Sequence, residues 1–331
     1  MIKKILFLVA VILVFVVALL FVIDSKADRI VWGVNFSHKH AQDMGLDWQQ
    51  TYFEILDDLG ANNIKLLTHW DLLEPLKDNY YFDDLDWQLA EAEKRSAKVI
   101  LVVGMKTGRW PECHLPGWAQ DLSKEEQQKE VLELIESVVL RYRDSKAILT
   151  WQAENDPFFP FGNCPWADED FVKKEIDLIK RLDERSRPVI VSDTGEFSLW
   201  IKPARLGDIV GTTMYKRVWS KELGVYVDLI FPPGFYLAKA KFIEKVFGKR
   251  VIVVELQAEP WGPKLLYNSP LQEQLKSMNL EQFRKNVEFA SETGFDEFYL
   301  WGVEWWYWMK EKQSDAKIWE EAKRLFSNTK L

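Results

Sequence analysis

Two kinds of hydrophobic pattern alternate along the chain from residue 28 onward. Short runs of apolar and β-branched residues, typical of buried strands, alternate with longer stretches whose apolar positions recur at helical spacing. The pattern predicts strands near residues 30–36, 63–68, 98–103, 147–153, 188–192, 208–214, 250–256 and 297–302. It predicts helices near residues 47–60, 84–96, 123–143, 168–186, 233–248, 280–294 and 314–327.

This alternation favours a closed (β/α)8 TIM barrel with eight parallel strands. The link between the fifth and sixth strands, around 197–206, is short, so we expect a reduced helix there. A doubly wound open sheet is the alternative, but the first strand is followed by GVNFSHKH and not by a glycine-rich phosphate loop. No linker or low-complexity segment divides residues 28–331, so we expect one domain there.

The N-terminus has a different pattern, because residues 5–23 are apolar without interruption. A helix over this run would nearly match the ~30 Å hydrocarbon core of a bilayer. We therefore expect residues 1–27 to form an uncleaved transmembrane anchor, with a signal peptide cleaved after Ala27 as the alternative. The two lysines of MIKK would stay cytoplasmic, so both alternatives place the domain from residue 28 outside the cytoplasm.

Composition narrows the possible partners. The formal net charge of −8 argues against a nucleic-acid partner, which would require a clustered basic face. The chain has 16 tryptophans and 14% aromatic residues, which suggests aromatic platforms in addition to core packing. An acidic domain on a single anchor is compatible with a monomer, which is what we expect.

In a barrel, functional groups belong on the loops after the C-terminal ends of the strands. Taken singly, an acidic residue at such a position is most simply a solvated group or a helix cap. The occurrence of acidic residues at several strand ends together favours a functional site. The polar and aromatic residues at these positions are Asn35, Ser37, His38, His69, Trp70, Glu74, Arg109, Trp110, Glu112, Glu154, Asn155, Asp156, Asp193, Glu196, Tyr215, Glu255, Gln257, Glu259, Trp261, Trp301 and Glu304.

Several kinds of catalysis lack their sequence signature. Four histidines are present (His38, His40, His69 and His114), but no HExxH or CxxC accompanies them, so we predict no catalytic metal. Neither a GxSxG elbow nor a P-loop is found. What remains is paired carboxylates beside aromatics and amides. Glycoside hydrolysis uses such groups. One carboxylic acid protonates the leaving oxygen, while a second carboxylate either attacks the sugar or activates a water molecule.

Four segments resemble those of the clan A retaining glycoside hydrolases, the β-galactosidase and cellulase-like barrels. WQAENDPF (151–158) resembles their fourth-strand motif, in which Asn precedes the acid/base Glu, and IVVELQAEPW (252–261) resembles the seventh-strand segment with the nucleophile. HWDLLEPLKDNYYFDDLDWQLAEAEKRSAKVILVVG (69–104) resembles their second-strand region and the third strand. YLWGVEWW (299–306) resembles an eighth strand ending in Trp. The resemblance spans nearly the whole exported domain without resolving an individual family.

This resemblance implies an enzyme that hydrolyses β-glycosidic bonds of oligo- or polysaccharides with retention of configuration and without a cofactor. By position, Glu255 matches the nucleophile and Asp156 the acid/base, while Glu154 matches a supporting group. The expected sugar-binding residues are Asn35, His69, Asn155, Tyr215, Trp261 and Trp301.

Asp156 departs from the pattern, because the acid/base position usually holds glutamate. The lost methylene withdraws the carboxyl by about 1 to 1.5 Å. Retaining enzymes hold their carboxyls ~5 to 5.5 Å apart and inverting ones ~6.5 to 9.5 Å, so the pair could fall between the classes. One outcome is that the backbone shifts and compensates for the shorter side chain. A second outcome is that the misplaced carboxyl slows hydrolysis. A third outcome is a catalytically impaired, glycan-binding (lectin-like) barrel at the cell surface.

The two cysteines, Cys113 and Cys164, follow the third and fourth predicted strands. In an exported domain the first expectation for such a pair is a disulfide, here between adjacent loops on one barrel face. The bridge would stiffen the rim beside Asp156. Two unpaired buried thiols are the alternative.

Overall fold

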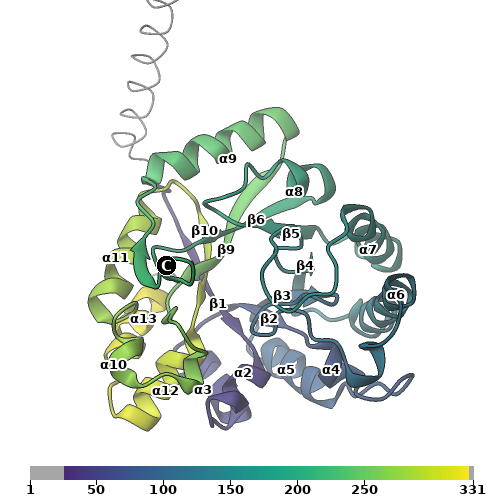
Figure 1. Cartoon of the computed structure of the whole chain (residues 1–331), viewed down its shortest axis with the longest axis horizontal. Helices are drawn as coiled ribbons and strands as arrows, with labels where there is room; N and C mark the ends of the chain where they lie inside the picture. The colour runs from purple at the N-terminus through teal and green to yellow at the C-terminus, as the bar shows by residue number, and fades with distance from the viewer. Residues whose placement is uncertain (1–25, 328–331) are drawn as a thin grey trace, which may run out of the picture.

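A computed structural model describes residues 26–327 and shows a ring of helices around a central barrel (Figure 1). Eight parallel strands close the barrel in the order β1-β10-β9-β6-β5-β4-β3-β2, which confirms the predicted fold. The strands are β1 (Val31–Phe36), β2 (Asn63–Leu67), β3 (Lys98–Val103), β4 (Ile148–Ala153), β5 (Val189–Asp193), β6 (Ile209–Met214), β9 (Arg250–Gln257) and β10 (Glu297–Trp301). All eight predicted strands are therefore present, with ends that differ by at most one residue.

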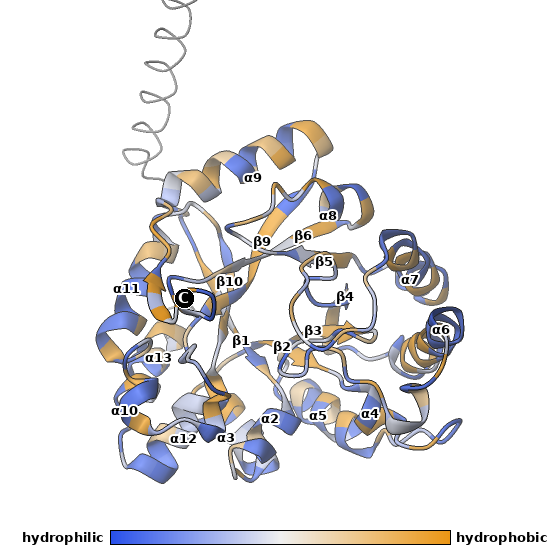
Figure 2. Ribbon diagram, in the orientation of Figure 1, coloured by the Kyte–Doolittle hydropathy of each residue, from blue (hydrophilic) through white to orange (hydrophobic). Residues whose placement is uncertain are grey.

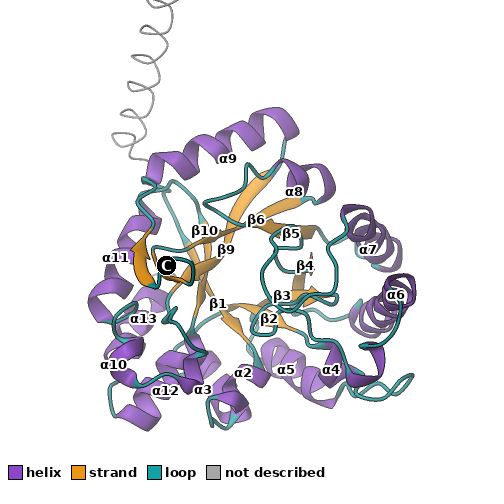
Figure 3. Cartoon of the chain, viewed as in Figure 1, coloured by secondary structure: helices purple, strands orange, loops and turns teal. Residues whose placement is uncertain are grey.

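The predicted helices are also present, as Figure 3 shows. They are α3 (Trp48–Asp57), α5 (Asp83–Lys94), α6 (Lys124–Tyr142), α7 (Glu169–Leu182), α9 (Pro233–Phe247), α11 (Leu280–Ser291) and α13 (Lys317–Ser327). The link between β5 and β6 holds the short α8 (Ile201–Leu206), as expected. The unpredicted helices are α2 (His38–Asp43), α4 (Trp70–Leu73), α10 (Leu271–Gln274) and α12 (Val303–Gln313), and a hairpin of β7 (Arg217–Ser220) and β8 (Val225–Asp228) follows β6.

The strands are buried on both faces, which explains their nearly continuous apolar runs. One face packs against the helices, which carry both hydrophobic and hydrophilic residues (Figure 2). The other face fills the barrel with Ile100, Ile190, Ile252, Val254 and Tyr299. Successive side chains alternate between the two faces.

This alternation places two polar side chains inside the barrel. Val34 and Phe36 pack outward against the helices, so Asn35 between them points inward. Ile64 and Leu66 likewise pack outward, so Lys65 also points inward. Both polar residues are fully buried.

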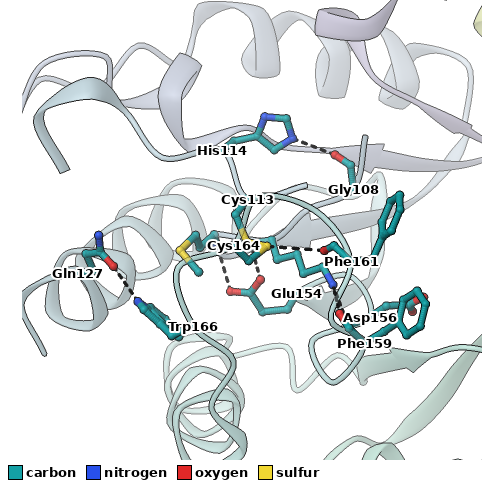
Figure 4. Close-up of a disulfide and its surroundings, with 12 residues drawn as sticks. Gly108, Cys113, His114, Gln127, Glu154, Asp156, Phe159, Phe161, Cys164 and Trp166 are labelled. Atoms are coloured by element: carbon teal, nitrogen blue, oxygen red, sulfur yellow. Dashed lines mark hydrogen bonds between the residues drawn. A yellow bond between two sulfur atoms is a disulfide. The ribbon is translucent and has the colours of Figure 1, made fainter. Parts of the chain in front are cut away.

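Cys113 and Cys164 form the predicted disulfide, with Cα atoms 5.1 Å apart. Figure 4 shows this bridge above Glu154, joining the loop after β3 to the loop after β4. In the chain-entropy model a loop of this length contributes roughly 4 kcal/mol to stability.

Within residues 26–327, no helix has both the length and the apolar character needed to cross a membrane. The predicted span at residues 5–23 lies outside the described residues.

Candidate active site

Glu255 lies near the C-terminal end of β9 and is only 4% exposed. Its Oε2 accepts a hydrogen bond from the Tyr215 hydroxyl at 2.8 Å. On the other side, Lys65 Nζ lies 3.3 Å from Glu255 Oε1 and 2.8 Å from Asn155 Oδ1. Lys65 therefore ties a carboxylate of β9 to an amide that follows β4.

Lys65 was not among the residues expected at the site. Its signal in the sequence is a lysine inside NIKLL, on the strand face opposite Ile64 and Leu66. Burial lowers the pKa of Lys65, and the charge of Glu255 acts against this shift. A buried ammonium is stable only beside an anion, and Glu255 supplies that partner for Lys65.

Asp156 follows β4, with its main chain in the left-handed region at φ 47°. Its N–H donates to Ser192 Oγ at 2.8 Å. The side chain is buried, and Oδ1 has no hydrogen-bond partner among the described residues. Burial, together with the negative charge of Glu255, raises the pKa of Asp156 to about 7. A carboxyl with such a pKa holds a proton near neutrality and can act as a general acid.

Glu154, two residues before Asp156, supports the neighbouring loop (Figure 4). Its carboxylate accepts the main-chain N–H groups of Met105, at 2.8 Å, and of Lys106. Behind it, burial raises the pKa of Glu175 on α7 well above its usual range, and the charge of Glu154 adds to the shift. The structure thus places Glu154 where it fixes the start of the β3 loop.

Asn35 and His69 occupy positions different from those expected. The Asn35 amide donates to main-chain carbonyls inside the barrel, with Val254 O at 3.0 Å. His69 Nε2 lies 2.7 Å from Ser37 Oγ, and its ring centroid is 4.1 Å from that of His114. Neither residue exposes significant surface. These contacts favour structural roles for both residues over the sugar contacts expected from the sequence.

Trp301 ends β10 with its ring beside the carboxyl cluster. The Arg109 guanidinium carbon lies 4.2 Å from the ring centroid. Arg109 also forms buried ion pairs with Glu259 and with Glu304 Oε2, the latter at 2.6 Å. This network fixes the Trp301 ring from the loops after β3 and β9 and from the first turn of α12.

A chain of aromatic rings extends from Tyr215 toward the rim. The Trp261 ring centroid lies 5.1 Å from that of Tyr215 and 5.4 Å from that of Phe161. Trp110, which is partly exposed, follows at 6.4 Å from Phe161. Because Tyr215 also bonds Glu255, these rings connect the carboxyl cluster to the surface and could stack on sugar faces.

Glu112 is a third carboxyl in the same environment, and no motif in the sequence indicates a specific role for it. Burial raises its pKa to about 8, Lys106 opposes the shift, and the charges of Glu255 and Asp156 add to it. Glu112 is 8% exposed. The cluster therefore contains Glu255, which is paired with the buried Lys65. It also contains Asp156 and Glu112, whose raised pKa values keep both carboxyls protonated near neutrality.

The described residues include an acidic group of metal-binding size, made of Glu74, Asp78 and Glu130. Its carboxylates already accept hydrogen bonds from protein groups. Trp70 Nε1 lies 2.8 Å from Glu74 Oε2, and Lys77 Nζ lies 2.8 Å from Glu130 Oε1. We assign no metal to it.

No model of a known protein family matches the chain, and neither does any curated protein. Solved structures do match its fold. A cold-adapted β-galactosidase from Rahnella sp. R3 aligns with TM-score 0.59 and 14% identity over 93% of this chain and 57% of that chain. A GH5_18 protein from Bifidobacterium longum subsp. longum aligns with TM-score 0.59 and 12% identity, over 83% of this chain and 70% of that one.

A glycosylated endo-β-1,4-xylanase of glycoside hydrolase family 10 from Gloeophyllum trabeum aligns with TM-score 0.56 and 14% identity. That alignment covers 83% of this chain and 85% of the xylanase. The chain thus spans a little over half the length of the Rahnella β-galactosidase and most of the xylanase. The expected resemblance to barrel glycoside hydrolases is confirmed as a likeness of fold, and the individual family stays unresolved.

Proposed function

We propose that the chain is a glycoside hydrolase that cleaves β-glycosidic bonds of oligo- or polysaccharides by retaining double displacement. The observation that supports this proposal most strongly is that one cluster holds two carboxyls with different surroundings. Glu255 is paired with Lys65 and Tyr215, whereas Asp156 forms no ion pair with any described residue and has a pKa raised to about 7. Two carboxyls with divergent environments supply a nucleophile and a proton donor.

In the first step, Glu255 attacks the anomeric carbon while the proton of Asp156 passes to the leaving oxygen. The glycosidic C–O bond breaks as the bond between the sugar and Glu255 forms. In the second step, Asp156 takes a proton from water, which attacks the anomeric carbon and releases Glu255. Asn155, Tyr215, Trp261 and Trp301 are the proposed sugar contacts.

The names of the structural neighbours support the reaction class, since they include β-galactosidases, a xylanase and GH5_18 proteins. A second function stays open because of the short acid at position 156. If Asp156 does not reach the leaving oxygen, the same cluster and aromatic chain would bind a glycan without hydrolysing it.

We infer that residues 5–23 anchor the chain in a bilayer with the barrel outside the cytoplasm, or that cleavage after Ala27 releases it. The uninterrupted apolar run and the preceding lysines support this location. Carbonate extraction of membranes from expressing cells tests it, because an anchored chain stays in the pellet. Light scattering tests the proposed monomer.

The function is tested on the detergent-solubilised full chain with a panel of aryl β-glycosides. We expect Glu255→Gln to abolish turnover while glycan binding persists. Glu297→Gln is the matched control, because Glu297 is a carboxylate at the opposite end of the barrel, bonded to Tyr299. Equal turnover by Glu255→Gln and the parent would exclude the proposed nucleophile.

A further inference from the structure

The loop after β3 runs directly beside the proposed sugar site. Lys106 O accepts the N–H of Asn155 at 2.5 Å. At Gly108, an added Cβ would lie 3.1 Å from Trp301 Cη2 and 3.4 Å from Asn155 Nδ2. The main chain of this loop therefore passes in contact with two of the proposed sugar-binding residues.

Glu112 is held firmly on this loop. It adopts a left-handed φ of 75°, its N–H donates to Arg109 O at 2.5 Å, and its carbonyl accepts the Thr107 N–H at 3.1 Å. The following residue is Cys113, which is bonded to Cys164. From the β4 loop, Gly162 approaches so closely that a Cβ there would lie 2.4 Å from Glu112 Cβ.

None of the described residues donates a hydrogen bond to the Glu112 carboxyl, and its oxygens keep some contact with the surface, although the residue is only 8% exposed. Two nearby acidic side chains differ from Glu112 in this respect. Glu255 accepts from Lys65 and Tyr215, and Glu304 accepts from Arg109 and from Ser37 N.

Lys106, the cation with the largest effect on the pKa of Glu112, does not supply the missing bond. Lys106 Nζ donates to the carbonyls of Asp156, at 2.9 Å, and of Phe159, at 2.7 Å. An ionised carboxylate without a direct partner is unfavourable in such a site, so Glu112 retains its proton. Its raised pKa of about 8 agrees with this arrangement.

We propose that Glu112 is a second proton-donating carboxyl of the site and shares the acid/base function with Asp156. This inference rests on the proposed hydrolase function. The glutamate reaches one methylene further than Asp156 and comes from the adjacent loop. In the first step its proton passes to the glycosidic oxygen as the C–O bond breaks and the sugar bonds to Glu255. In the second step the Glu112 carboxylate takes a proton from the attacking water.

The test uses the full chain and its Asp156→Asn, Glu112→Gln and double variants. Each is assayed on two aryl glycosides of the same sugar, one with a good leaving group and one with a poor leaving group. A proton donor matters only for the poor leaving group. We therefore expect each single variant to lose about tenfold or more in kcat/KM on the poor substrate and little on the good one. The double variant should lose ~100-fold or more, because no donor remains.

Added azide gives a readout that a structural role would not move. On the substrate with the good leaving group, azide should raise kcat of the double variant and yield a glycosyl azide, because azide attacks the glycosyl-enzyme intermediate without a general base. Glu297→Gln is the control for an unrelated carboxylate, and thermal unfolding checks that each variant is folded. Glu112→Asp should keep part of the poor-substrate activity.

Three outcomes would overturn the proposal. In the first, Glu112→Gln leaves the leaving-group dependence unchanged. In the second, it slows both substrates equally, which indicates binding or positioning. In the third, the parent turns over no substrate, or Glu255→Gln retains full activity. Only the third also overturns the proposed function, so the two failures are distinguishable.

Discussion

The buried ammonium of Lys65 on β2 lies 3.3 Å from the carboxylate of Glu255 on β9, across the interior of the barrel. Removing one partner of a buried pair leaves the other charge uncompensated, which costs about 3–5 kcal/mol. We therefore expect Lys65→Met to lower the free energy of unfolding by that order and to reduce turnover. Urea denaturation and aryl glycoside kinetics measure the two effects.

The double variant Lys65→Met/Glu255→Gln is the control for this pair. It leaves no unpaired charge, so its free energy of unfolding should exceed that of Lys65→Met alone. If the double variant is less stable than the single variant, Lys65 acts through packing and not through Glu255.

The pH dependence of kcat/KM should report the proton on Asp156. Its pKa is raised to about 7, and the group must be protonated to donate, so activity should fall as pH rises through about 7. In Asp156→Asn the remaining donor is Glu112, whose pKa is raised mainly by burial to about 8 in the parent and loses only the smaller contribution of the Asp156 charge, so the pH at which activity falls should move upward. A pH profile identical to that of the parent would contradict this assignment.

The stability of the fold should fall with rising pH because of Glu112. Its pKa is about 8 in the fold against an ordinary 4.5, so the folded state keeps a proton that the unfolded chain has already released. The penalty is absent below about pH 4.5 and grows until about pH 8, at roughly 1.4 kcal/mol per pH unit. Glu112→Gln should remove it. Urea midpoints at pH 5 and pH 8.5 measure the difference, and an equal gap between the two proteins at both pH values would refute it.

Gly162→Ala should disturb Glu112 directly. The new Cβ would lie 2.4 Å from Glu112 Cβ, so Glu112 or the β4 loop must shift. We expect a loss of about tenfold or more in kcat/KM, because a misplacement of ~1 Å can cost ~100-fold. Gly224→Ala is the matched control. Gly224 also has positive φ, but an added Cβ there meets nothing within 4 Å. Equal losses in the two variants would show that backbone strain alone is responsible.

The barrel was predictable because its strands are buried on both faces and interrupted at regular intervals. The hydrophobic pattern did not predict α12. Its sequence VEWWYWMKEKQ buries Trp305, Trp306 and Tyr307 and shows no single apolar face. The β7–β8 hairpin was missed because its strands are short and only half-buried.

The site was predictable only as far as its motifs reached. The motif-matched pair Asp156 and Glu255 does lie in one cluster. Lys65 was missed because a lysine in a short strand is usually solvated, and only closure of the barrel brings it to Glu255. For Asn35, the sequence could not show that its amide turns inward and donates to main-chain carbonyls, among them that of Val254.

The central claim is that Glu255 is the covalent nucleophile, and mechanism-based labelling tests it most directly. The full chain is incubated with an activated 2-deoxy-2-fluoro glycoside of a sugar that it turns over, and the digested protein is analysed by mass spectrometry. We expect one sugar adduct, located on Glu255, and loss of activity in proportion to labelling. An adduct on Asp156 or Glu112, or continued turnover with no adduct and with inversion of configuration, would contradict the mechanism.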